Sequence, residues 1–207
     1  QDAKIIIWLP DPKTGRKRKL ATMNDKCAGG TGAVIDRIAA KLHLSQGQLQ
    51  ELRYANVRLH SVAGKCGVFA ETDINSLQKQ GVPSQELMVS LLEAIVQQNL
   101  SVLTRGNTLR PKVLLLGGPN TFVPCLQEAW RQHIPGIWQE RRLSLPEGAT
   151  PEELIVVPEN SLFYAALGAA LYGQQEEGQA GTYAGTAALQ EYIEVGRRRA
   201  REATGRG

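Results

Sequence analysis

The chain has 207 residues, of which 42% are hydrophobic, and its formal net charge is +4 at pH 7. This size and composition support one substantial core and exclude a disordered chain. No apolar run reaches the roughly 18 residues that a membrane span needs, and the first residues lack the order of a signal peptide. We therefore expect a cytoplasmic protein with no membrane partner.

Much of the positive charge lies in two local runs, residues 16–19 and 197–199. Aromatic residues make up only 5% of the chain, and no nucleic-acid recognition motif accompanies either run. Both runs are therefore interpreted as solvated surface, and no nucleic-acid partner is expected.

The first half of the chain predicts a hairpin followed by helices. Residues 3–9 and 20–24 are rich in strand-forming side chains and flank a turn at 10–15 that contains two prolines and a glycine. From Thr31 onward, apolar residues recur with helical period. Further helices are expected at about 45–53, up to about residue 80, and from 87 to 103.

The second half predicts alternating strands and helices. An apolar strand at 112–116 runs into Gly117 and Gly118, and helical spacing follows at 121–133. A second strand at 154–157 precedes a helix of small residues at 162–172. Strand and helix alternate as in an α/β domain, predicted at 1–173, followed by a linker at 174–186 and a charged helical connector at 187–207.

The chain contains three cysteines, Cys27, Cys66 and Cys125. An odd number of cysteines does not suit a disulfide framework. Metal binding, catalysis or simple burial remain as their roles. Cys125 follows Pro124 inside a predicted helix, and we interpret it as a packed, small apolar residue.

Cys27 lies in a glycine-rich turn, residues 24–32, that leads into a helix. The backbone amides of such a turn and the helix dipole favour a bound anion, either phosphate oxygens or thiolates. A thiolate would be stabilised here, which suits metal ligation. A tight turn with a buried thiol is the alternative.

Cys66 is also followed by a helix, and Gly64 and Gly67 lie on either side of it. An iron–sulfur cluster takes four thiolates, so two such cysteines in one chain imply either two missing ligands or a symmetric dimer. Structural zinc sites typically use close Cys-x-x-Cys pairs, which this chain lacks.

Other polar and glycine positions carry weaker signals. Gly117 and Gly118 follow an apolar strand and would let a planar ligand or a phosphate approach the backbone. Glu71 and Asp73 are expected to open a helix, where stabilising its dipole is the alternative to a ribose or magnesium contact. The three histidines have no metal-ligand spacing and are interpreted as structural: His43, His60 and His133.

Four motifs, at 23–32, 66–72, 116–118 and 166–172, together resemble the activators of 2-hydroxyacyl-CoA dehydratases and the ATPase subunits of benzoyl-CoA reductase. The resemblance covers about residues 1–173 and implies an α/β fold class: a ribonuclease H-like lobe of the acetate-kinase, sugar-kinase and actin ATPase superfamily, with a helical C-terminal extension. It also implies that the chain is the C-terminal half of the activase, with the first phosphate motif and most of the second outside this sequence.

The same resemblance implies a homodimer that shares one 4Fe-4S cluster, held by Cys27 and Cys66 of each subunit. ATP with magnesium would drive single low-potential electrons to a 2-hydroxyacyl-CoA dehydratase or aryl-CoA reductase. ATPase activity is expected only of the full-length, two-lobed protein. The implied nucleotide-binding positions are Gly30, Thr31 and Gly32 at phosphate or ribose, Glu71 at ribose, and Gly117 and Gly118 at adenosine.

Two alternatives stay open on the sequence. One is a cluster-free small-molecule kinase or sensor ATPase of the same superfamily, with structural cysteines. The other is a non-catalytic interaction lobe.

Overall fold

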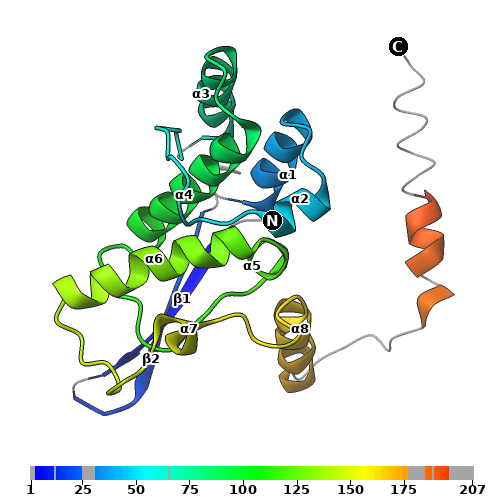
Figure 1. Ribbon diagram of the computed structural model, residues 1–207. Coiled ribbons are helices and arrows are strands. Elements are labelled where there is room, and N and C mark those ends of the chain that lie inside the picture. Colours follow the sequence, from blue (N-terminus) through cyan, green and yellow to red (C-terminus); the bar gives the residue numbers. More distant parts are fainter. Residues whose placement is uncertain are drawn as a thin grey trace. The chain divides into compact units, whose positions relative to one another are not determined.

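A computed structural model describes residues 3–11, 13–24, 31–64, 66–176, 185–187 and 189–195 (Figure 1). The chain divides into two compact units, residues 1–164 and 165–207. The helices and strands that carry the predicted motifs at 31–32, 66–72 and 116–118 all belong to the first unit.

The predicted hairpin is confirmed. Strands β1 (Lys4–Pro10) and β2 (Lys17–Met23) pair antiparallel, with Ile7 opposite Leu20. The Asp11 carboxylate accepts hydrogen bonds from two backbone N–H groups of the turn, and Gly15 adopts a positive φ of 67° that closes it. Along β1 only the Ile7 side chain is fully buried, so one face of the hairpin is anchored to the unit.

The next two helices also follow the prediction. Helix α1 (Gly32–Lys41) buries the apolar stripe that its sequence period indicated, and α2 (Gln46–Glu51) begins at a capping box between Ser45 and Gln48. The buried residues of α1 are Val34, Ile35, Ile38 and Ala39.

Helix α4 forms the centre of the core. Helix α3 (Gly67–Lys79) ends before Gly81, whose φ of +81° turns the chain, and α4 (Ser84–Leu103) follows. Helix α4 packs against α1, α3 and α6, and α6 passes across it in Figure 1. It is buried nearly all round, which explains why its apolar residues outnumber those of a one-sided amphipathic helix.

The strands of the second half are shorter than predicted. Strand β3 (Val113–Leu114) pairs in parallel with β4 (Ile155–Val156), and the Leu115 N–H extends the ladder to the Val156 carbonyl at 2.8 Å. Short helix α7 (Pro151–Leu154), which the pattern did not predict, leads directly into β4.

One predicted helix, at 121–133, is two. Helix α5 (Gly118–Phe122) begins at the second glycine of the pair, and α6 (Pro124–Glu140) continues beyond the predicted end. They are separated at Val123, whose ψ of 89° lies outside the helical region. The cause is Pro124, because a proline disfavours the helical conformation in the residue before it. Trp138 and Ile134 of α6 are among the most buried side chains of the core.

The second unit contains most of α8 (Tyr164–Gln175), which covers most of the predicted helix at 162–172. Residues 186–187 and 189–195 are helical; all but residue 186, the last of the predicted linker, fall in the predicted connector. Residues 177–184, most of the predicted linker, lie outside the described part, and the domain boundaries stay predictions. Across the stretches that the structure describes, none of the helices combines the length and apolarity that a membrane crossing requires.

Candidate functional site

Helices α1 and α3 meet near their starts and run in the same direction. Near the start of α3, a Cβ on Gly67 would lie 3.1 Å from a methyl carbon of Val34 on α1. About one turn further along α3 and two turns further along α1, Lys41 Nζ donates to Glu71 Oε1 at 3.0 Å. Because both contacts advance in the same direction, the N-termini of the two helices lie at the same end of the pair.

The residues at these two N-termini are the predicted site residues Thr31 and Cys66. Thr31 is the N-cap of α1 and is buried, and Cys66 is the N-cap of α3 and is half-buried. Unsatisfied N–H groups give a helix start a partial positive charge, which favours a thiolate or a phosphate. Cys27 and Gly30, which precede Thr31 in the chain, lie outside the described residues.

The glycine pair at the end of β3 lies against the start of α1. A Cβ on Gly32 would lie 3.0 Å from Pro119 Cγ, so the first residue of α1 contacts α5. Gly117 has a φ of +87°, and the space around the missing Cβ of both Gly117 and Gly118 is open. The structure therefore brings the predicted positions 31, 32, 117 and 118 into one region, at the carboxyl end of a parallel strand, where α/β folds bind ligands.

Thr121 of α5 and Ser161, from the loop after β4, hold the Gly117 turn. Thr121 Oγ1 donates to the Gly117 carbonyl at 2.9 Å and lies 2.6 Å from Ser161 Oγ. The Gly117 N–H donates to the Ser161 carbonyl at 3.3 Å. Ser161 is 40 residues from Thr121 in sequence, and sequence reasoning did not identify either residue.

Glu71 joins α1 to α3. Its carboxylate accepts a hydrogen bond from Lys41 and lies 3.3 Å from Arg37 Nη2. The hydrogen bond and the charge of Lys41, followed by the charge of Arg37, lower the pKa of Glu71 below its usual value. Helix α3 begins at Gly67, so Glu71 and Asp73 lie beyond its first turn, and the expectation that they open the helix and stabilise its dipole is wrong. The ribose role of Glu71 stays a prediction.

Asp73 instead contacts the segment that leads to Cys66. Its Oδ2 accepts the Ala63 N–H at 2.8 Å, and His60 of the same segment lies 2.8 Å from Glu86 Oε2 on α4. Sequence reasoning missed these contacts, and Gly64 was the only local signal of a close approach.

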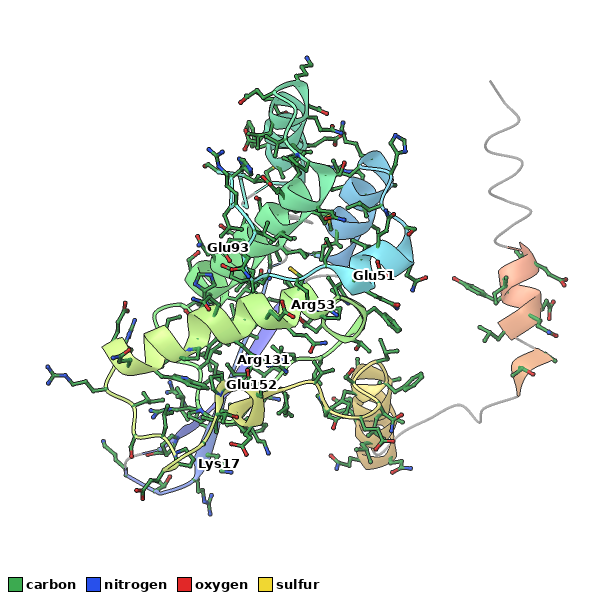
Figure 2. All side chains as sticks on the ribbon, in the orientation of Figure 1. Lys17, Glu51, Arg53, Glu93, Arg131 and Glu152 are labelled. Atoms are coloured by element: carbon green, nitrogen blue, oxygen red, sulfur yellow. The ribbon has the colours of Figure 1, made fainter. Side chains whose placement is uncertain are left out.

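A buried carboxylate ties α4 to α6 away from these helix starts. Glu93 is 8% exposed and accepts hydrogen bonds from Tyr54 Oη at 2.9 Å, from Gln97, and from His133 Nε2 at 2.7 Å (Figure 2). Burial, and then the hydrogen bond to Glu93, raise the pKa of Tyr54 above its usual value. His133 is therefore structural, as predicted.

Cys125 is fully buried at the second residue of α6, which confirms its prediction as a packed residue. Burial is the main cause that raises the pKa of its thiol to about 12. Although it also lies at a helix start, it is not available as a metal ligand in this fold.

The donor set of the described residues fits part of a cluster site. No group of three or more His, Cys, Asp and Glu within the described ranges is arranged to hold a metal. Cys66 offers one half-exposed thiol at a positive helix end, where an iron–sulfur cluster needs four thiolates. The fit therefore requires cysteines in addition to Cys66.

The BadF/BadG/BcrA/BcrD ATPase family matches residues 7–129, more than half of the chain. The chain is 30% identical over 153 residues to the uncharacterized protein YjiL of Escherichia coli K12. This alignment covers 74% of this chain and 52% of YjiL. It is 27% identical over 175 residues to the activator of lactoyl-CoA dehydratase of Anaerotignum propionicum, over 84% of this chain and 59% of that protein.

The fold is similar to a solved activator of the 2-hydroxyisocaproyl-CoA dehydratase from Clostridium difficile with bound ADPNP. The TM-score is 0.61 and the sequence identity 25%, over 88% of this chain and 62% of that one. This confirms the predicted fold class, an α/β lobe of the actin-like ATPase superfamily. The chain spans about half the length of the curated relatives it matches.

Proposed function

Because the chain belongs to the BadF/BadG/BcrA/BcrD ATPase family, we propose that it is the C-terminal lobe of an ATP-dependent activase. The full protein would deliver single low-potential electrons to a 2-hydroxyacyl-CoA dehydratase or an aryl-CoA reductase in the cytoplasm. The observation that carries the proposal is the common end of α1 and α3, where Thr31 and Cys66 cap parallel helices.

Nucleotide binding is assigned to the region where α1 meets α5. Gly30, Thr31 and Gly32 would bind phosphate or ribose, since the start of α1 offers backbone N–H groups and the positive end of its dipole. Gly117 and Gly118 would lie along the adenosine, because the open space at both glycines permits close approach of a planar base. Magnesium would accompany ATP, and the missing lobe would supply the remaining phosphate contacts.

Cys27 and Cys66 are the proposed cluster ligands. Two thiolates from each chain of a homodimer give the four that a 4Fe-4S cluster takes, and the cluster would supply one-electron transfer. The residues of this chain hold and orient the ligands: Gly67 lets α3 start directly against Val34, and Glu71 keeps the two helices in register through Lys41. The starts of both helices thus present positive dipole ends to the negatively charged thiolates.

The test is iron and acid-labile sulfide in the full-length protein purified without oxygen. We expect about four iron atoms per dimer, lost in Cys27→Ala and in Cys66→Ala. Cys125→Ala is the matched control and should keep its iron, because that thiol is buried in the core. ATP hydrolysis measured on the same preparations should survive in the control.

A protein that hydrolyses ATP and contains no iron in any form would overturn the cluster assignment. That result would favour a cluster-free small-molecule kinase or sensor ATPase of the same superfamily. Absence of both iron and hydrolysis would favour an interaction lobe without catalysis.

A further inference from the structure

The segment that leads to Cys66, residues 57–64, forms neither helix nor strand, yet side chains of α3 and α4 hold it. We name residues 57–64 the lead segment. Irregular backbone of this kind has no ladder of its own, so its N–H groups need partners from elsewhere. Two of them have side-chain partners, the half-buried Asp73 on α3 and the buried Ser90 on α4.

The first partner comes from α3 itself. Asp73 Oδ2 accepts the Ala63 N–H at 2.8 Å, three residues before Cys66. Because Cys66 caps the same helix that carries Asp73, this hydrogen bond sets the path of the chain relative to the helix start. A hydrogen bond to an ionised carboxylate is shorter and stronger than one between neutral groups.

The second partner comes from α4. Ser90 is 1% exposed, and its hydroxyl donates to the Glu86 carbonyl at 2.7 Å. Its oxygen therefore has lone pairs left to accept the His60 N–H at 2.9 Å. The His60 ring also lies 2.8 Å from Glu86 Oε2, so backbone and side chain of one residue are both tied to α4.

The last residue of the lead segment touches α4 directly. A Cβ on Gly64 would lie 2.5 Å from the Ala94 carbonyl oxygen, a distance that backbone atoms do not tolerate. Only glycine therefore lets the chain pass this close to α4 before it reaches Cys66.

We propose that Asp73, Ser90 and Gly64 are positioning residues for Cys66: they hold the lead segment so that the Cys66 sulfur keeps one orientation toward the group that it binds. The inference rests on the proposed function, in which Cys66 binds iron. Groups that orient a metal ligand change metal affinity or activity by about 10- to 100-fold when they are removed. Hydrogen bonding and solvent around cluster sulfurs also set the reduction potential.

The test uses the full-length protein with Asp73→Ala, Asp73→Asn and Ser90→Ala. Asp36→Ala is the matched control, since Asp36 is an exposed residue on α1 and the same atoms are removed from a helix. Alanine does not weaken α3 by propensity, so any loss reflects the Ala63 contact. Hydrogen exchange at the Ala63 amide reports the lead segment, and the rate of iron loss to a chelator and the electron paramagnetic resonance spectrum of the reduced cluster report the site.

We expect Asp73→Ala to speed exchange at Ala63 and iron loss each by about tenfold and to shift the resonance spectrum. Asp73→Asn keeps an acceptor oxygen and should restore most of both rates, and Asp36→Ala should match the wild type. Ser90→Ala should speed exchange at the His60 amide and iron loss, which keeps the proposal testable if Asp73→Ala does not fold.

Unchanged exchange at Ala63 in Asp73→Ala would overturn the inference whatever the iron content. Faster exchange with an unchanged spectrum and unchanged iron loss would overturn the positioning role. If the wild-type protein holds no iron, the proposed function fails, and the rate of Cys66 alkylation is measured in the same variants instead. An alkylation rate that Asp73→Ala leaves unchanged overturns the inference. A rate that Asp73→Ala changes and Asp73→Asn restores supports it.

Discussion

Two regions of this molecule contain the same two ingredients, a cysteine at the start of a helix and a carboxylate that joins two helices. At the α1 and α3 starts, Cys66 is half-buried and Glu71 pairs with the exposed Arg37 and the half-buried Lys41. At the crossing of α4 and α6, Cys125 is fully buried and the buried Glu93 carboxylate accepts hydrogen bonds from Tyr54 and His133.

The difference teaches that burial, and not helix position, decides what each residue does. A helix start stabilises a thiolate by its partial charge, but desolvation disfavours the charged form. At Cys125 desolvation is the larger effect. In the same way, Glu93 contributes to stability because its carboxylate is buried, whereas the ion pairs of Glu71 are screened by solvent.

The largest expected effect comes from removing the buried carboxylate. Glu93→Ala should lower the free energy of unfolding by about 3 kcal/mol, because partly buried donors including Tyr54 Oη lose their acceptor. Urea unfolding measures this change in free energy. Glu51→Ala, at an exposed position in α2 (Figure 2), is the control and should change stability by less than about 0.5 kcal/mol. An equal loss of unfolding free energy in Glu93→Ala and Glu51→Ala would show that burial of the carboxylate does not decide its contribution.

Cys125 should resist alkylation in the folded protein. A pKa near 12 instead of 9.0 cuts the thiolate fraction at pH 8 about a thousandfold, and the higher nucleophilicity of that thiolate recovers only about 30-fold of this. Site-resolved mass spectrometry should therefore show alkylation at least about 30-fold slower than for the same residue in urea. The raised pKa implies stability that is complete below pH 9 and declines as the pH rises toward 12. Rapid labelling of Cys125 at pH 8 in the native state would refute its burial.

Tyr54→Phe sharpens the account of the buried region. Losing the hydrogen bond to Glu93 should cost about 1 kcal/mol. Because the pKa of Tyr54 is raised in the folded state, its contribution is complete below the unfolded value of 10.0 and is lost as the pH rises above it. Melting temperatures measured between pH 8 and 11 should fall less steeply for Tyr54→Phe, and identical slopes would show that this phenol does not contribute.

The smallest effect is expected at the exposed ion pairs. Glu71→Gln should lower the melting temperature slightly at low salt, and the difference from wild type should vanish at high salt. The lowered pKa of Glu71 means that its stabilisation is present above the unfolded value of 4.5 and is lost as the pH falls through the folded value. Glu51→Gln is the control. A difference that persists at high salt and at acidic pH would show that Glu71 acts by packing and not by charge.

Local features of the fold could be predicted because their causes lie within a few residues. The period of α1, the capping signal at Ser45 and the turn at Gly81 each depend on neighbours in the chain. Predictions failed where a distant or adjoining constraint intervened: Pro124 divides one predicted helix in two, and β3 pairs over a shorter length than its apolar run indicated.

The sequence by itself determined the order of most helices and strands, the glycine turns and the family, because periodicity, turn chemistry and motif spacing are local properties of the chain. Only the tertiary structure decided the partners. His60 contacts Glu86, which is 26 residues away in the sequence, and His133 contacts Glu93, which is 40 residues away. No local pattern encodes these pairs, since they form only when α4 packs against its neighbours and water is excluded. That same packing makes Cys125 a core residue and leaves Cys66 half-exposed at the start of α3.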